Sequence, residues 1–369
     1  MQYKVIPSYI FEEDNFIQNY KKLEDTFRKY YAQYNIAYSF KTNYTPYVCR
    51  LVKELGGYAE VVSKMEYDLA KSLGYEDNKI IFNGPCKGIY PNCILNVDSL
   101  DEISKTGNNK IGLRVNINVG QNFISRFGID EKDLDKAFEM AGDRIVGIHC
   151  HISQARSKEA WQKRTETLLE IVDKYFSSRE LEYLDLGSGM YGDMDEHLKS
   201  QFSNVPTYED YANVTAKLIN EYFKDKKKPL LFTEPGTTLI NKYIDFVCNV
   251  EAIKNIKGQT FITLSGSKHN LGEICELKQL PIEVIHNGGD LINITNGKLV
   301  GYTCLEHDVM LKDFNGELAL GDTIVFKNVG GYSLVSKPPF IRPNCAMYTD
   351  KGLLIKKEET NKEIFSTYE

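Results

Sequence analysis

The stretch that decides the fold is residues 36–57, IAYSFKTNYTPYVCRLVKELGG, because short apolar runs like its first six residues return along the chain. That first run, IAYSFK, has about the length of a buried strand. Apolar residues from Tyr47 to Leu55 then recur at intervals of three and four, which predicts an amphipathic helix that ends at Gly56. The stretch therefore predicts one strand followed by one helix.

Eight such apolar runs follow one another through the chain, at 36–41, 59–63, 80–84, 94–99, 112–116, 146–153, 183–189 and 230–236. Helical spacing is clearest in the connections at 65–73 and 158–175, whereas the connection after Gly84 is too short for a full helix. Strand–helix units in series favour a parallel α/β sheet. The count of eight favours a closed, TIM-like (β/α)8 barrel over an open doubly wound sheet.

Residues with distinctive chemistry stand at the carboxyl ends of these runs. They are Lys41, Arg114, His151, the Gly187-Ser188-Gly189 turn and Glu234. In a barrel these ends converge on one pocket, whereas in an open sheet they would be spread along a line. The sequence therefore predicts a single active site at this end of the barrel.

From about residue 245 the strand-like runs continue without long helices between them. This change predicts a second, all-β domain. We therefore expect a barrel over residues 12–245 and a β domain over residues 246–369. Residues 1–11 look extended and are compatible with joining the β domain as well as the barrel.

The composition excludes several classes of protein. The 369 residues carry a net charge of −6 with both signs mixed, so neither nucleic acid nor an anionic membrane is an expected partner. The chain lacks a secretory signal and an apolar run of about 18 residues, so we expect it in the cytoplasm. The eight cysteines show no CxxC spacing and are expected to be free thiols, and no motif predicts a metal site.

Each candidate residue has an ordinary alternative when it is taken alone. Lys41 in a barrel mouth would be partly desolvated, which suits Schiff-base chemistry, but a lone lysine after a strand is more often solvated. The Gly187-Ser188-Gly189 turn can aim N–H groups at a phosphate, or it can be a tight turn only. Glu234 needs a cation or a proton, which either a pyridine nitrogen or an ordinary salt bridge would supply.

Two histidines, His149 and His151, belong to one predicted strand. We expect them to point to opposite faces of it, which speaks against their joint ligation of a metal. We expect His151 to face the pocket, where its imidazole could stack on a planar cofactor. The alternative is an ordinary core histidine whose hydrogen bonds are satisfied.

Motifs through nearly the whole chain carry a resemblance to a known family. They are Ala37–Asn43 (AYSFKTN), Glu60–Glu66 (EVVSKME), Leu113–Val115 (LRV), Ser125–Gly128 (SRFG), His149–Gln154 (HCHISQ), Leu184–Met190 (LDLGSGM), Glu234–Gly236 (EPG), Gly301–Cys304 (GYTC) with Asp308, and Gly331-Tyr332 with Phe340. In this order they resemble the diaminopimelate and ornithine decarboxylase family, class III of the pyridoxal-phosphate enzymes, with the alanine-racemase-like fold. The resemblance implies a biosynthetic decarboxylase of an α-amino acid or amino-acid conjugate, with pyridoxal 5′-phosphate as cofactor.

The resemblance also implies which residues carry the function. The cofactor would be bound by Lys41, Glu60, Arg114, His151, Ser153, Gly187, Ser188, Gly189, Glu234, Gly236, Thr237 and Tyr332. The catalytic residues would be Lys41, His151 and Cys304. Lys41 would form a Schiff base with the cofactor, His151 would stack on the ring, and Glu234 would keep the pyridine nitrogen protonated.

The remaining implied roles concern the phosphate, the ring hydroxyl and a second subunit. Tyr332 would bind the phosphate together with the glycine turn, and Arg114 would sit beside the ring hydroxyl with Glu60 as its ion-pair partner. Cys304 would reach the site from the second subunit of a homodimer and protonate the carbanion left by carbon dioxide. The substrate would be contacted by Glu306, Asp308, Phe340 and Arg342.

The sequence departs from the family pattern where cofactor and substrate would bind. Thr237 follows Glu-Pro-Gly where the family usually has a phosphate-binding arginine, and residues 151–153 lack one glycine of the family's histidine motif. Leu305 replaces an acid that reads a distal amino group, so we expect a substrate other than ornithine, lysine or diaminopimelate. Arg342 indicates that the distal group of the substrate carries a carboxylate. Substrates of this kind are used by the branch of the family that acts in siderophore and natural-product pathways.

Two other functions are compatible with the same residues. One is an amino-acid racemase of the same fold, although racemases place an arginine at the ring nitrogen where this chain has Glu234. The other is a non-catalytic homologue that binds pyridoxal phosphate or regulates another protein. The presence of Lys41, Gly187, Gly189 and Cys304 speaks against this second function. Cofactor absorbance would separate it from an enzyme, and release of carbon dioxide would separate a decarboxylase from a racemase.

Overall fold

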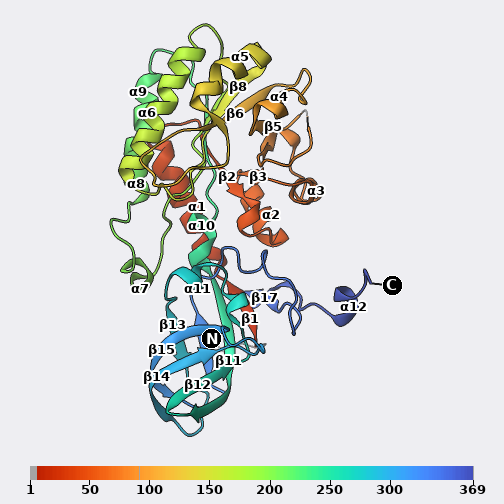
Figure 1. Cartoon of the computed structure of the whole chain (residues 1–369), viewed down its shortest axis with the longest axis vertical. Coiled ribbons are helices and arrows are strands. Elements are labelled where there is room, and N and C mark those ends of the chain that lie inside the picture. Colours follow the sequence, from red (N-terminus) through yellow and green to blue (C-terminus); the bar gives the residue numbers. More distant parts are fainter. Residues whose placement is uncertain (1–5, 91, 369) are drawn as a thin grey trace. The chain divides into compact units, whose positions relative to one another are not determined.

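The computed structural model describes residues 6–90 and 92–368, which form two compact units (Figure 1). The barrel unit consists of residues 19–192 and 204–238. The sheet unit consists of the described residues up to Gln18, residues 193–203, and the described residues from Leu239 onward. The chain therefore passes from one unit to the other several times along the sequence.

Eight parallel strands form a closed barrel in the barrel unit. They are β2 (Tyr34–Ser39), β3 (Tyr58–Val61), β4 (Ile80–Phe82), β5 (Ile94–Val97), β6 (Ile111–Asn116), β8 (Ile145–His149), β9 (Tyr183–Asp185) and β10 (Leu230–Thr233). Each strand pairs with the next, and β10 pairs with β2 to close the ring. A short strand, β7 (Ile129–Asp130), adds to β6. The predicted closed barrel is confirmed, and every barrel strand overlaps one of the eight apolar runs.

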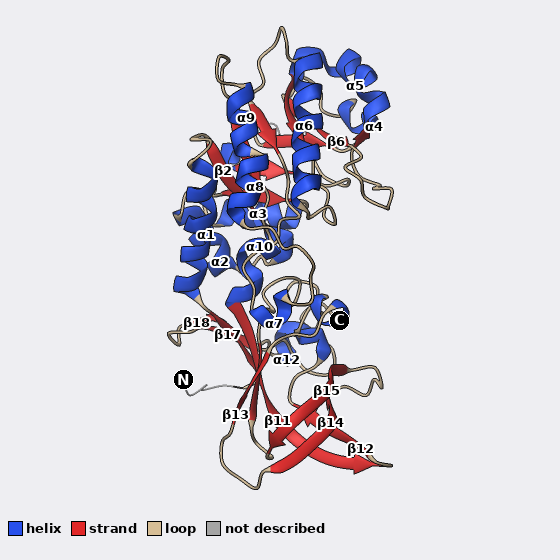
Figure 2. Ribbon diagram, turned by 90° about the vertical axis from the view of Figure 1, so that its left-hand side faces the viewer, coloured by secondary structure: helices blue, strands red, loops and turns tan. Residues whose placement is uncertain are grey.

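Helices lie around these strands (Figure 2). They are α1 (Glu13–Arg28), α2 (Pro46–Glu54), α3 (Lys64–Ser72), α4 (Leu100–Ile103), α5 (Leu134–Ala141), α6 (Lys158–Tyr175), α8 (Tyr208–Val214), α9 (Ala216–Tyr222) and α10 (Thr237–Ile240), with short 3-10 helices at Phe40–Thr42, Asp77–Lys79, Glu131–Asp133 and Gly142–Arg144. The hydroxyls of Ser63 and Ser157 accept the free N–H groups of Glu66 and Ala160 in the first turns of α3 and α6, which fixes where these helices begin. Between β4 and β5 the described residues form no helix, as the short connection predicts. Within the described part of the chain, no helix is both long and apolar enough to cross a membrane.

The interior of the barrel is filled by side chains. Tyr183 projects into it and donates a hydrogen bond of 2.7 Å from its hydroxyl to Oδ1 of Asn96. A Cβ atom on Gly112 in β6 or Gly147 in β8 would lie 2.0 or 2.1 Å from the Tyr183 side chain, so both strands need glycine there. The ring packs in a buried cluster with Ala37, Tyr58, Ile81, Val146 and Phe232. The barrel is therefore a packed core rather than a channel.

The sheet unit is built from β-strands. They are β1 (Ser8–Phe11), β11 (Ile244–Ile256), β12 (Gln259–Leu264), β13 (Ile282–Ile285), β14 (Ile292–Val300), β15 (Val309–Leu318), β16 (Thr323–Phe326), β17 (Ala346–Thr349) and β18 (Leu354–Lys356). Short helices lie at α7 (Glu196–Lys199), α11 (Ile274–Leu277), α12 (Asn361–Ile364), Asn241–Tyr243 and Lys268–Asn270. Strand β1 pairs antiparallel with β11 and parallel with β17, so the N-terminal strand joins this sheet.

The long hairpin of β14 and β15 is the part of this sheet that the sequence did not predict in full. Only the last two residues of β14 fall in a strand-like run of the sequence, LVGYTC at 299–304, and β15 falls in none. The pairing of the two strands shifts register at several points, and their buried residues do not alternate regularly. Because a strand is recognised by strict alternation, such shifts hide it in the sequence.

The contact between Gly147 and Tyr183 yields a first prediction. The substitution Gly147→Ala should lower the free energy of unfolding by about 1–3 kcal/mol, because the new methyl group would press on the tyrosine ring. Denaturant unfolding can be followed through Trp161, the single tryptophan, which belongs to the barrel unit. In a Tyr183→Ala background the same substitution should be much less destabilising. An equal loss in both backgrounds would show that Gly147 is required for another reason.

Candidate active site

Lys41 and Glu60 form an ion pair at the carboxyl ends of two neighbouring strands. Lys41 lies in the 3-10 helix that follows β2, and Glu60 lies in β3. The ammonium group contacts Oε2 of Glu60, which also accepts a hydrogen bond of 2.7 Å from the Ser39 hydroxyl. The Glu60 side chain is 1% exposed whereas that of Lys41 is 31% exposed. The buried carboxylate of Glu60 therefore positions the partly exposed amine of Lys41.

Glu234, directly after β10, is a buried carboxylate with partners on both oxygens. Its Oε1 accepts a hydrogen bond from the amide of Asn83, which also donates to Oε1 of Glu60 at 3.1 Å. Its Oε2 lies 3.1 Å from Nε2 of His149 and 3.7 Å from Nδ1 of His151. Burial alone would raise the pKa of Glu234, but the two imidazoles and Lys41 outweigh it and hold the pKa below its usual range. Glu234 is therefore ionised.

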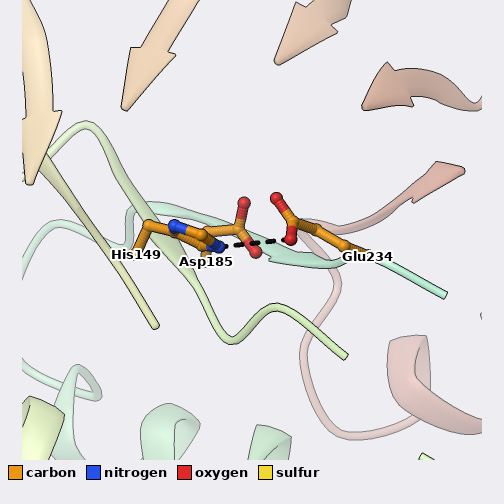
Figure 3. Close-up of side chains that lie close together, drawn as sticks. All are labelled: His149, Asp185 and Glu234. Carbon is orange, nitrogen blue, oxygen red and sulfur yellow. Dashed lines mark hydrogen bonds and ion pairs between the residues drawn. The ribbon is translucent and has the colours of Figure 1, made fainter. Parts of the chain in front are cut away.

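Asp185, the last residue of β9, completes a buried group with His149 and Glu234 (Figure 3). Burial and the negative charge of Glu234 raise the pKa of Asp185 well above its ordinary value, so this carboxyl group is protonated. Its Oδ1 accepts the N–H of Gly187 at 2.8 Å, and its carboxyl group makes a side-chain hydrogen bond with Glu234. The neutral acid lets Glu234 keep its charge without a second charge beside it.

The expected orientation of the two histidines is wrong. His149 and His151 do not point to opposite faces, because both imidazoles approach the same oxygen of Glu234. Side chains two residues apart on an extended chain lie on the same side, so the spacing should have predicted this arrangement. His149 is the fully buried partner, and His151 reaches the cavity with 22% of its side chain exposed.

Arg114 has a different partner from the one that the sequence suggested. We expected an ion pair with Glu60, but Glu60 pairs with Lys41. The guanidinium of Arg114 lies 3.4 Å from the carboxylate of Asp98 and over the ring of Phe127 at 4.7 Å. The sequence gives no signal for this, because Asp98 follows the fourth strand without any motif around it.

These residues open onto one cavity of about 490 Å³. Of the predicted site residues it is lined by Lys41, Glu60, Arg114, His151, Ser153 and Glu234, and of the others by Asn83 and His149. The Gly187-Ser188-Gly189 turn and Gly236 do not line it. A Cβ on Gly236 would lie 2.0 Å from the Thr42 hydroxyl, so this glycine allows close packing beside the Lys41 helix. Thr237 is the first residue of α10.

The predicted residues of the sheet unit gather around the turn that carries Cys304. Cys304 and Glu306 are exposed. Asp308 is buried, and its carboxylate accepts hydrogen bonds from the Thr303 hydroxyl at 2.6 Å and from the Ser267 hydroxyl at 3.0 Å. A Cβ on Gly301 would lie 2.1 Å from the same carboxylate. Asp308 therefore holds the Cys304 turn in shape.

Arg342 lies beside the same turn. Its guanidinium lies over the Tyr302 ring at 4.6 Å and donates to the carbonyl of Ser265 at 3.2 Å. Phe340 is 41% exposed, and Tyr332 adopts a positive φ of 58°. Stacking leaves the remaining N–H groups of Arg342 available for an anion.

Besides Asp98, sequence reasoning missed Asn83, Asp185 and Arg164, and it assigned His149 to the wrong face of its strand. Asn83 and Asp185 are polar residues within the predicted runs 80–84 and 183–189, so their position was a usable signal. Arg164, in the middle of α6, carried no signal because a helix interior is an ordinary place for arginine. Its side chain is fully buried and donates to the carbonyl groups of the glycine turn.

Comparison with known proteins gives a consistent result. The profile of a family described as "Pyridoxal-dependent decarboxylase, pyridoxal binding domain" matches residues 16–241, and that of the matching "C-terminal sheet domain" matches residues 167–330. The diaminopimelate decarboxylase of Methanocaldococcus jannaschii is 25% identical over 98% of this chain and 90% of its own length. That of Archaeoglobus fulgidus is 27% identical over 91% of this chain and 87% of its own.

Solved structures share the fold. A crystal structure of the M. jannaschii diaminopimelate decarboxylase has a TM-score of 0.85 at 23% identity, covering 99% of this chain and 92% of that one. The Helicobacter pylori enzyme complexed with L-lysine has a TM-score of 0.84 at 22% identity, covering 99% and 97%. The lysine decarboxylase of Selenomonas ruminantium has a TM-score of 0.77 at 21% identity, covering 94% and 93%.

The pKa of His151 yields a second prediction. Burial lowers the pKa of His151 from 6.5 to about 4, although Glu234 acts in the opposite direction. Because the folded value lies below the unfolded one, the neutral imidazole contributes stability above pH 6.5 that is lost as the pH falls through about 4. In the cofactor-free protein, NMR should find this ring uncharged down to about pH 5.

The variant Glu234→Gln provides the direction test for this titration. It removes the negative charge that favours the imidazolium, so the pKa of His151 should fall further. The exposed ring of His197 serves as an internal reference in the same spectra. A rise in the variant, or titration of His151 at 6.5 or above in the parent protein, would contradict the burial argument.

Proposed function

The chain belongs to the pyridoxal-dependent decarboxylase family, and from this premise we propose that it decarboxylates an α-amino acid whose distal end carries a carboxylate. The chain is a carboxy-lyase with pyridoxal phosphate as its cofactor. The observation that carries the proposal is the joint placement of Lys41, Glu60 and Glu234 around one cavity. The nature of the substrate rests on Arg342 and Leu305.

The residues at the barrel mouth fit this cofactor. Its aldehyde needs an amine, which Lys41 offers at the cavity. Its ring nitrogen needs a charged acceptor, and Glu234 is ionised and buried. Its ring hydroxyl is acidic, and Arg114 is a cation held in place by Asp98. When bound, pyridoxal phosphate supplies an electron-poor ring that delocalises the electron pair left by departing carbon dioxide.

The surrounding residues control charge and protons at this site. Glu234 would stabilise a proton on the ring nitrogen of the bound cofactor, because His149 and Asn83 keep its carboxylate charged and oriented. Asp185 remains neutral and so adds no second negative charge. Neutral His151 lines the cavity and would offer an uncharged imidazole to the cofactor. Glu60 orients the Lys41 amine and competes with the cofactor for it.

The choice of substrate follows from the region around Cys304. Leu305 offers no charge to a distal ammonium group, whereas Arg342 offers a guanidinium whose partners in the described residues are the Tyr302 ring and the Ser265 carbonyl and not an acid. A carboxylate is the anion that this fork binds best. Diaminopimelate, the substrate in the names of the relatives, carries a distal carboxylate, and so does an amino acid linked to citrate. Both belong to the proposed class, so the proposal readmits diaminopimelate, which the sequence analysis set aside because of Leu305.

The proposal includes a homodimer and a cytoplasmic location. Cys304 is exposed on its turn, and Cys304 of the partner subunit would deliver a proton to the carbon from which carbon dioxide leaves. All eight cysteines are free, which is consistent with a reducing compartment. The measurement for the homodimer is the molar mass in solution, with activity in mixtures of Lys41→Ala and Cys304→Ala chains as the test of shared sites.

The first test concerns the lysine. The purified protein with added pyridoxal phosphate should show a visible absorbance band that borohydride abolishes, and Lys41→Ala should lack it and lose at least about 10³-fold in decarboxylation. The control is Lys64→Ala, which removes a lysine that is 72% exposed and should leave both unchanged. A borohydride-sensitive band of normal size in Lys41→Ala would assign the cofactor to another lysine.

The second test concerns the distal group. Amino acids with and without a distal carboxylate, including meso-diaminopimelate, a citrate conjugate and lysine, are compared by release of carbon dioxide. Arg342→Leu should raise KM for the carboxylate-bearing substrate about tenfold or more with little change in kcat, because a charge-assisted contact is lost. If the protein also decarboxylates lysine, the KM for lysine should not rise in Arg342→Leu. Faster turnover of lysine than of every dicarboxylate would reject the proposed substrate class.

A further inference from the structure

Arg164 is a buried cation without an acidic partner among the described residues. Its side chain is 0% exposed and stacks on Trp161 at 4.3 Å. Its hydrogen-bond partners are carbonyl oxygens of two loops. Nη1 donates to Leu186 at 2.7 Å and Ser188 at 3.0 Å, and Nη2 donates to Ile152 at 3.1 Å. A buried charge that is matched only by dipoles favours an anion nearby.

The carbonyl contacts of Arg164 set the direction of the N–H groups that follow. In a planar trans peptide the C=O and the next N–H point in opposite directions. With the Ser188 and Ile152 carbonyls turned to the guanidinium, the N–H groups of Gly189 and Ser153 point away from it. Neither N–H has a hydrogen-bond partner in the described parts of the chain. Two backbone donors from separate loops are thus oriented by one side chain.

The two loops are in close contact. A Cβ on Gly187 would lie 2.6 Å from the carbonyl of Cys150, and one on Gly189 would lie 2.6 Å from that of Ile152. Only glycine therefore lets the turn after β9 pack against the loop after β8. Ser153 lines the cavity that contains Lys41, so this packing brings the paired donors to its border.

The segment after Glu234 does not provide a positive charge for a phosphate. Residues 235–240, Pro-Gly-Thr-Thr-Leu-Ile, contain no basic side chain. A phosphate ester carries up to two negative charges and is bound by N–H groups together with a cation. Arg164, directly behind both loops, is a cation that meets this need without exposing its side chain.

We propose that Arg164 is the positioning residue of the cofactor's phosphate site: it fixes the Gly189 and Ser153 N–H groups towards the phosphate and supplies the positive charge behind them. This inference rests on the proposed function, since it takes the phosphate of pyridoxal phosphate as the anion. It assigns Arg164 no contact with the reacting atoms. It also explains how a chain with Thr237 after Glu-Pro-Gly can retain the cofactor.

The test compares pyridoxal phosphate with pyridoxal, which lacks the phosphate. Dissociation constants of both are measured by absorbance for the parent protein, Arg164→Met, Arg164→Lys and the control Lys163→Met, which removes an exposed charge from the same helix. Arg164→Met should weaken binding of pyridoxal phosphate about tenfold or more and that of pyridoxal less than about twofold. Arg164→Lys should lie between, and Lys163→Met should match the parent.

The outcomes are distinguishable. If the parent protein binds neither compound, the proposed function fails and this inference with it. If the parent binds both and Arg164→Met weakens both equally, or neither, Arg164 has a structural role only and the inference is overturned. If Arg164→Met does not fold, Arg164→Lys decides by the same ratio. Inorganic phosphate should raise the melting temperature of the cofactor-free parent more than that of either Arg164 variant, and an equal rise would also overturn the inference.

Discussion

A carboxylate removed from water must be matched by donors or must take up a proton, and Glu234 meets this constraint with help from three other strands of the barrel. Asn83 and His149 bind its two oxygens. Asp185 carries a proton, because two acids so close together cannot both be ionised. The position of Lys41 depends on the same arrangement, because Asn83 joins the carboxylate of Glu234 to that of Glu60. The charge of one buried acid thus governs the order of the whole barrel mouth.

Closure of the barrel makes this arrangement possible. Glu234 follows β10, whereas its partners follow β4 or end β8 and β9, and these strands come together only because β10 pairs with both β9 and β2. In an open sheet the Lys41 and Glu234 strands would be the first and last of the series. The ring of strands that defines the fold therefore also brings the site residues together, and a sequence that specifies this ring specifies the site as well.

The sequence predicted the barrel because its strands are short, apolar and buried on both sides. Such strands appear in the sequence as short apolar runs, which can be recognised without a structure. It predicted Lys41 and Glu234 as site residues because a charged side chain at the end of an apolar run can also be recognised from the sequence alone. It could not assign Arg114 to Asp98 rather than to Glu60, since the choice between two acids depends on distances in space. Arg164 was invisible for the same reason, because its partners are backbone carbonyls, which every residue has.

The Tyr183 ring, set between Gly112 and Gly147, has a further consequence for the space that the substrate and the products can use. With its neighbours it fills the interior of the barrel, so the strands enclose packed side chains and not a passage. The cavity at the strand ends is lined in part by Phe123 to Phe127, in the loop after β6. A larger side chain in this loop would therefore reduce the room for the substrate and for the products that replace it.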